Sequence, residues 1–222
     1  MATKKSWAVG AALLVGGAVA AEARAAPCYV DSEGGDDAND GLAEASPVRT
    51  QDAIPSSCTE VYYARGSVFD EAVATGGMGG PGGGSGRTLF TNYGDENLPL
   101  PAFIVESGSV VSSFQGAITV DGLHLEGSRG DGTMENLIQG VCVTMGGDSQ
   151  LLNCEITDCD IGIMLMGENS LVQGNVIHDL NMAVDSTDTS VYANIVGGAE
   201  GIFVNGSNNE GAYNTFFNCK DT

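Results

Sequence analysis

The chain contains a repeat of about twenty residues toward its C-terminal end. Three asparagines recur at intervals of 19 and 20 residues, namely Asn175, Asn194 and Asn214. Cys154 lies 21 residues before the first of them. An apolar residue follows two positions after each of these four, namely Ile156, Ile177, Val196 and Phe216. A single repeat of this length cannot bury its own apolar face, so the pattern predicts a solenoid of stacked coils.

Two further columns of the repeat indicate what kind of solenoid this is. One column places a small residue before an apolar one, at Gly140, Gly162, Ala183 and Gly201. The other begins at Leu151, Val172 and Val191. Three short strands per repeat, with no helical periodicity between them, predict an all-β parallel β-helix with three sheets. Inward asparagines stacked at one turn would hydrogen-bond each other and the buried backbone.

The N-terminus has the features of an export signal. Two lysines precede an apolar run at 7–20, and small residues at 23 and 25 suit a signal peptidase, so we place the signal peptide at 1–25. An N-terminal lead-in and cap is expected at 26–60, with a short helix that Ser46 and Pro47 open and Pro55 ends. The coils are expected at 61–222. The chain stops directly after a coil, which predicts an exposed last coil, a stack that lacks C-terminal coils, or an oligomer.

The charge of the chain excludes some partners. Its formal net charge is −21, and removal of the signal peptide changes it to −23. Nucleic acids and acidic membranes require clustered basic residues, which are absent from the sequence. An acidic polysaccharide would need bridging cations such as Ca²⁺. The alternative interpretation of the negative charge is that it keeps an exported protein soluble.

The six cysteines are consistent with disulfides in a secreted, extracellular or periplasmic protein. Cys28 and Cys58 bracket the N-terminal segment and are the pair we expect. Cys159 and Cys219 are predicted to lie three coils apart, too far for a disulfide. Cys154 is expected to be a buried thiol. The pairing of the other cysteines, including Cys142, stays open.

Three stretches of the sequence resemble one known family. They are YVDSEGGDDANDGL at 29–42, VYYARGSVF at 61–69 and LFTNYGDEN at 89–97. With the coils they make residues 28–219 similar to the secreted right-handed parallel β-helix proteins related to pectate and other polysaccharide lyases. The resemblance implies a right-handed coil and a carbohydrate partner. It does not specify an activity, because this scaffold carries lyases, hydrolases, esterases, epimerases and adhesins.

The family's known catalytic patterns are missing from this chain. Lyases of this fold use a lysine or arginine as the base, as the resemblance implies. After signal cleavage the only lysine is Lys220, in the terminal tail, and Arg129 lies in an inserted loop without an evident partner. The Gly-His-Gly and Arg-x-Lys motifs of pectin hydrolases do not occur either.

The best candidate for a chemical site comes from aligning the strands. The alignment places His124 beside Glu155 in one outward column, and Glu126 with Thr157 and His178 in the next. Four side chains are therefore expected on one face: His124, Glu126, Glu155 and His178. Imidazoles beside carboxylates can transfer protons or hold a metal. The alternative interpretation is a solvated polar surface.

A second candidate is an oxygen-rich loop near the mature N-terminus. Its five side chains are Asp31, Asp36, Asp37, Asn39 and Asp40. Several carboxylates on one loop suit Ca²⁺, although their spacing does not match an EF-hand. The alternative is that they are turn residues selected for backbone geometry.

From these features we expect an exported β-helix that binds polysaccharide or cell-surface carbohydrate, with Ca²⁺ as a candidate cofactor and without a complete known catalytic site. Two alternatives stay open. One is a polysaccharide lyase or glycoside hydrolase that acts on an acidic glycan. The other is a structural surface or adhesion protein.

Overall fold

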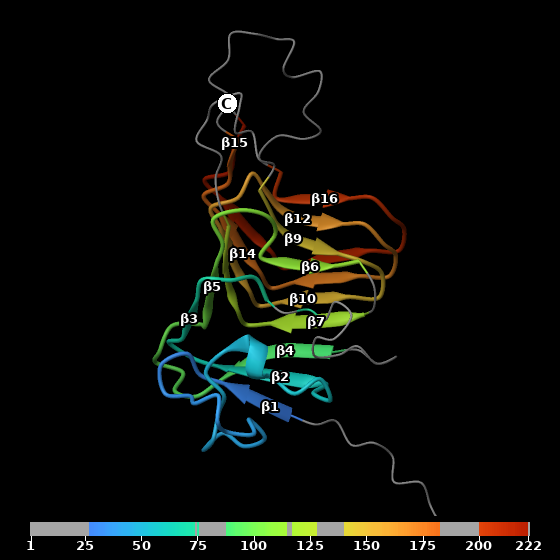
Figure 1. Cartoon of the computed structure of the whole chain (residues 1–222). Helices are drawn as coiled ribbons and strands as arrows, with labels where there is room; N and C mark the ends of the chain where they lie inside the picture. The colour runs from blue at the N-terminus through green and yellow to red at the C-terminus, as the bar shows by residue number, and fades with distance from the viewer. Residues whose placement is uncertain are drawn as a thin grey trace, which may run out of the picture.

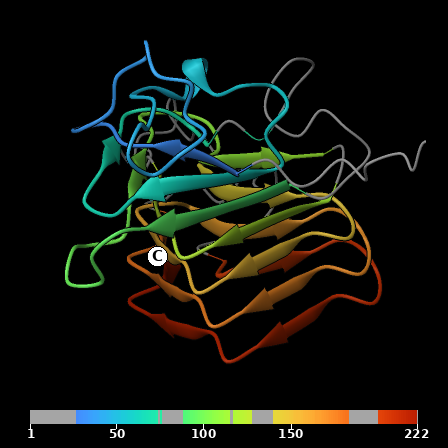
Figure 2. The same ribbon diagram turned by 90° about the horizontal axis from the view of Figure 1, so that it is seen from below.

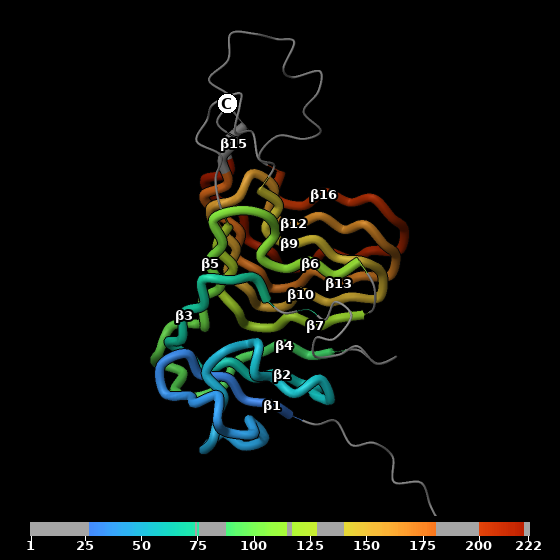
Figure 3. The backbone as a smooth tube through the Cα atoms, viewed as in Figure 1, coloured from blue at the N-terminus to red at the C-terminus, as the bar shows by residue number. Residues whose placement is uncertain are grey.

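The computed structural model describes residues 27–73, 75, 88–114, 117–127, 140–182 and 200–221. The expected signal peptide at 1–25 lies outside them. Figure 1 shows strands that rise in layers from β1 near the N-terminus to β16 near the C-terminus. The backbone trace in Figure 3 passes from layer to layer in chain order over most of this rise. We call each layer a rung.

The described strands form three main parallel sheets. The first sheet contains β1 (Pro27–Val30), β2 (Glu60–Ala64), β4 (Thr88–Tyr93), β7 (Ile118–Asp121), β10 (Gln150–Leu152), β13 (Leu171–Gln173) and β17 (Glu210–Ala212). The second contains β3 (Val68–Phe69), β5 (Ala102–Ile104), β8 (His124–Glu126), β11 (Glu155–Thr157), β14 (Val176–His178) and β18 (Thr215–Phe217). The third contains β6 (Val111–Ser113), β9 (Val141–Met145), β12 (Ile161–Leu165) and β16 (Ile202–Val204). A short pair, β15 (Asn181–Met182) and β19 (Lys220–Asp221), is separate.

This arrangement is that of a parallel β-helix, as the repeat predicted. Successive strands of one sheet come from successive rungs, and Figure 2 shows the rungs stacked when the molecule is viewed from below. Inward residues of one sheet lie above each other in register: in the second sheet Phe103, Leu125, Ile156 and Ile177 form one column, and all four are fully buried. Burial of such apolar surface is the main favourable term in folding.

Left-handed residues turn the corners between sheets. After the second sheet, the corner residues on three rungs are Asp158, Asp179 and Asn218, with φ of 59°, 54° and 53°. Asp and Asn are the side chains that tolerate this conformation best after glycine. The corner is therefore equivalent in all three rungs, and each of these side chains leaves the coil at the same position.

The asparagine column is confirmed for two of its members. The Asn175 amide accepts a hydrogen bond from the Cys154 N–H (2.9 Å) and donates to the carbonyl of Leu151 (3.0 Å). It also donates to Oδ1 of Asn214 (2.9 Å), and Asn214 donates in turn to the carbonyl of Val172 (2.9 Å). The inward amides thus satisfy backbone groups that the turn would otherwise leave unpaired inside the coil.

The expected spacing of the last coils is wrong. The sequence predicted a coil containing Asn194 between the rungs of Asn175 and Asn214, but β14 pairs with β11 on one edge and with β18 on the other. Both edges of β14 are occupied, so no other strand can lie there. Cys159 and Cys219 are consequently two rungs apart, not three. Asn194 itself lies outside the described residues.

The predicted short helix near Ser46 and Pro47 is also wrong. Val48 instead forms a parallel bridge with Val30: its N–H donates to the carbonyl of Tyr29, and its own carbonyl accepts from the N–H of Asp31. These bonds hold the backbone extended next to β1 where a helix would have to begin. A single 3-10 turn follows at Gln51–Ala53.

Two disulfides are present among the described residues. Cys28–Cys58 is confirmed, with Cα atoms 5.9 Å apart, and Cys142–Cys159 is a second bond at 5.7 Å. Cys154 is a buried free thiol, as expected, and burial raises its pKa to about 12. A disulfide-containing chain fits an oxidising, extracellular environment. Among the described residues, no helix has the length and apolar character that a membrane crossing requires.

The last described rung carries exposed apolar side chains. Phe216 stands in the inward register of Ile177, yet it is 46% exposed because β18 is the last strand of its sheet. Phe217 on the same strand is 51% exposed. Its ring lies next to the candidate site on the second sheet.

Candidate functional site

The outward face of the second sheet brings the four predicted residues together. The register pairs His124 with Glu155 and Glu126 with Thr157, and Thr157 in turn pairs with His178. These are the two outward columns that the sequence predicted. Outward side chains at paired positions of neighbouring parallel strands lie about one inter-strand distance apart. Side chains from three successive rungs can therefore form one cluster. We call His124, Glu126, Glu155 and His178 the His–Glu face.

Glu155 is at the centre of the His–Glu face. Its Oε1 lies 3.1 Å from Nε2 of His178, on the rung after it. Its Oε2 lies 3.9 Å from Nδ1 of His124, on the rung before it. The Glu155 side chain is 43% exposed, so its carboxylate lies between two imidazoles while it stays open to solvent.

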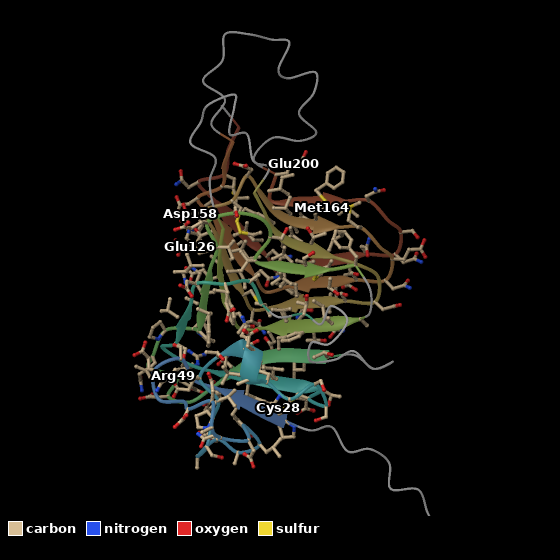
Figure 4. The ribbon with its side chains drawn as sticks, in the orientation of Figure 1. Cys28, Arg49, Glu126, Asp158, Met164 and Glu200 are labelled. Carbon is tan, nitrogen blue, oxygen red and sulfur yellow. A yellow bond between two sulfur atoms is a disulfide. The ribbon has the colours of Figure 1, made fainter. Side chains whose placement is uncertain are left out.

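His124 lies between two glutamates. Nε2 of His124 is 4.0 Å from Oε2 of Glu126, and this nitrogen is buried without a hydrogen-bond partner. Both of its separations from carboxylates exceed hydrogen-bonding distance. His124 is therefore next to two carboxylates without being committed to either, and a small movement would let it bond to one of them. In Figure 4, Glu126 and Asp158 lie on the same side of the coil.

His178 is the most firmly held member of the face. Nδ1 lies 2.7 Å from Oδ2 of Asp179, and Nε2 contacts Glu155. Phe217 stacks on the ring, with centroids 4.6 Å apart and planes 5° apart. Partial burial is the largest single influence on the pKa of His178 and lowers it, but the hydrogen bonds and charges of Asp179 and Glu155 together outweigh it and raise the pKa above 6.5.

The raised pKa of His178 predicts a pH-dependent stability. Because the folded chain binds this proton more tightly than the unfolded chain does, the stabilisation is complete below about pH 6.5 and is lost as pH rises through the raised pKa. Urea unfolding measured at several pH values from below 6.5 upward gives the free energy of unfolding of the wild type and of His178→Gln. The wild type should be the more stable of the two at low pH, and this difference should become smaller as the pH increases. His124→Gln retains His178 and should keep the dependence. A wild-type advantage that does not change with pH would contradict this prediction.

The side chains of the oxygen-rich loop bond to backbone groups, both of the loop itself and of the following segment at 47–50. Asp31 accepts from the N–H groups of Glu33 and Gly34, and Asp36 and Asp40 each accept from a backbone N–H two residues later. Asp37 accepts from the N–H groups of Arg49 and Thr50, and Asn39 donates to the carbonyl of Pro47. These bonds are typical of turn-forming residues.

No group of three or more His, Cys, Asp or Glu side chains among the described residues has an arrangement that could hold a metal ion. Calcium binding by the oxygen-rich loop at 31–40 stays a prediction from the sequence.

Asp179 is the member of the site that sequence reasoning missed. The signal was available, since Asp179 directly follows His178 at a corner of the repeat. What the sequence could not indicate is that the side chain at this corner turns back onto the ring of the preceding residue. Asn218, at the same corner of the next rung, donates through Nδ2 to Oδ1 of Asp179 and fixes it further.

Comparisons with known proteins show similarity in fold. No protein-family model matches the sequence, and neither does any curated protein. Two crystal structures of a GH136 lacto-N-biosidase from Eubacterium ramulus are similar: the selenomethionine derivative has a TM-score of 0.55 at 15% identity over 86% of this chain, and the native protein 0.54 at 16% over 85%. A structure described as a rhamnogalacturonan lyase has a TM-score of 0.39 at 16% identity, over 86% of this chain and 53% of its own.

The chain spans only about two fifths of the length of the lacto-N-biosidase structures, 41% and 40%. At this identity the likeness shows the fold alone. The chain is therefore similar in backbone arrangement to part of the longer lacto-N-biosidase chain.

Proposed function

We propose that this chain is an exported right-handed parallel β-helix of the pectate-lyase-like kind, and that it binds a glycan across the His–Glu face. The observation that carries this proposal is a set of contacts that links His124, Glu155 and His178 over three rungs, with the ring of Phe217 at one end. The two disulfides and the apolar N-terminal run support export.

The chemistry of the face suits sugars. Carboxylates accept hydrogen bonds from pairs of sugar hydroxyls, and bonds to charged acceptors are stronger than neutral ones. Aromatic rings such as Phe217 provide an apolar face against which the C–H side of a sugar ring can pack. Glu155 and Phe217 are both about half exposed, so a ligand can reach them without displacing the coil.

A catalytic role is the second candidate, and the position of His124 favours it. An imidazole 4.0 Å from Glu126 and 3.9 Å from Glu155 needs only a small movement, or one bridging water, to exchange a proton with either carboxylate. Paired carboxylates are also the groups that glycoside hydrolases use. In this alternative Glu126 and Glu155 act on a glycosidic bond, with His124 between them.

Binding should be measured by calorimetry against a panel of neutral, amine-bearing and uronate-containing oligosaccharides, with Ca²⁺ and with EDTA. We expect Glu155→Gln to weaken binding by roughly 10- to 100-fold, since the charged acceptor is lost while the shape is kept. Glu210→Gln, an exposed change on β17 of the first sheet, is the matched control and should bind as the wild type does.

The same incubations should be assayed for new reducing ends and for unsaturated products. Glycan binding without new reducing ends or unsaturated products supports the binding role. Products that the wild type forms and Glu155→Gln does not form support the catalytic role. If no glycan in the panel binds, or if the Glu155 variant binds as well as the Glu210 variant, the proposed function is wrong. Binding that EDTA abolishes would support the calcium prediction.

A further inference from the structure

We propose that Asp179 is the positioning residue of the His–Glu face: it holds His178 as an imidazolium, and His178 in turn holds the Glu155 carboxylate oriented toward the ligand. The part of this inference that concerns ligand binding rests on the proposed function. The part that concerns His178 does not, and it can be tested without any ligand.

The argument begins with the two nitrogens of one ring. Nδ1 of His178 lies 2.7 Å from a carboxylate oxygen of Asp179, and Nε2 lies 3.1 Å from one of Glu155. Ionised carboxylates only accept hydrogen bonds, and a neutral imidazole has only one N–H to donate. Both contacts are satisfied together when the ring carries two protons. The geometry therefore favours the charged form of His178.

The charged groups around the ring favour the same state. Glu155 faces it from β11 and Asp179 from its own corner, while Glu126 and His124 lie on β8. Asp158 occupies the corresponding corner one rung earlier, and the neighbour on β18 is the uncharged ring of Phe217. The described strands of the second sheet contain no lysine or arginine that would oppose a positive charge.

The backbone and the next rung keep Asp179 in place. Its left-handed conformation directs the side chain back toward His178, and the Asn218 amide holds its second oxygen. Stacking of Phe217 limits rotation of the imidazole. With the ring fixed, Oε1 of Glu155 is committed to His178, and Oε2, which faces His124, is the oxygen that can accept from a ligand.

The test compares Asp179→Asn with Asp158→Asn. Both changes remove one carboxylate at the same corner and in the same left-handed conformation, and the Asp158 carboxylate accepts a hydrogen bond from the hydroxyl of Thr157. Asparagine already occupies this corner at Asn218, so the variant backbone should fold. The chain has two histidines, and His124→Gln therefore assigns the signals of His178 in nitrogen-detected NMR.

We expect both ring nitrogens of wild-type His178 to be protonated at pH 6.5, and the titration midpoint to move down toward 6.5 in Asp179→Asn but not in Asp158→Asn. Affinity for a glycan that binds the wild type should then fall about tenfold at pH 7 in Asp179→Asn, recover toward lower pH, and stay unchanged in Asp158→Asn.

A wild-type His178 that is neutral at pH 6.5 overturns the inference, and so does an equal titration shift in the two variants. A binding loss in Asp179→Asn that does not recover at lower pH also overturns it. If the NMR result is as expected and no glycan binds, the positioning role stands while the proposed function fails.

Discussion

Replacing Asn175 with alanine is expected to lower the free energy of unfolding by about 2–4 kcal/mol. The amide is completely buried, and its removal leaves the N–H of Cys154 and the carbonyl of Leu151 without their partners inside the coil. Each buried polar group left unpaired costs about 1–3 kcal/mol, and the small cavity adds to this. Urea unfolding followed by circular dichroism measures the change.

Asn214→Ala is the matched control for Asn175→Ala. It removes the same inward amide from the last described rung, where the side chain is only partly buried and water can replace some of its bonds. Its cost should be clearly smaller. Equal losses in the two variants, or a loss below about 0.5 kcal/mol at Asn175, would show that the inward amides do not stabilise the stack.

Removing the Cys28–Cys58 disulfide by a double change to serine is expected to cost about 3–4 kcal/mol. The bond closes 30 residues between β1 and the start of β2, and chain-entropy arguments give this magnitude for a loop of that length. Because β1 is the end strand of its sheet, detachment of β1 after loss of the disulfide would also expose the core that it covers. Thermal and urea unfolding of the variant measure the loss.

Cys219→Ser provides the control for the disulfide variant. Cys219 is a free, partly buried thiol near the other end of the coil, so its replacement should change stability by less than about 1 kcal/mol. A reducing agent should lower the melting temperature of the wild type and leave that of the double-serine variant less affected. A wild-type melting temperature that does not change when reductant is added would contradict the prediction.

The His–Glu face could be predicted because register follows from the core. Once Leu125, Ile156 and Ile177 are assigned to one inward column, their neighbours His124, Glu126, Glu155 and His178 must point outward on the same strands. A shift of one residue would have turned all the apolar side chains toward water. The burial of the core thus placed the polar residues before any coordinates were known.

The protonation of His178 and the role of Asp179 could not be predicted in this way. They depend on the direction of a corner side chain and on an asparagine 39 residues away. In the N-terminal loop, the residues that could hold a cation are the same residue types that form turns, and the sequence cannot separate the two. The structure shows the aspartate oxygens bonded to backbone N–H groups.

The sequence by itself determined that this chain stacks short parallel strands around an apolar interior, because only stacking buries a face that recurs every twenty residues. Which rungs are neighbours was decided by the tertiary structure. A segment of coil length at 183–199 repeats the pattern as well as its neighbours do, yet β14 has two edges and both are paired, with β11 and β18. A repeat shows that strands can pair; the limited number of hydrogen-bonding edges decides which of them do.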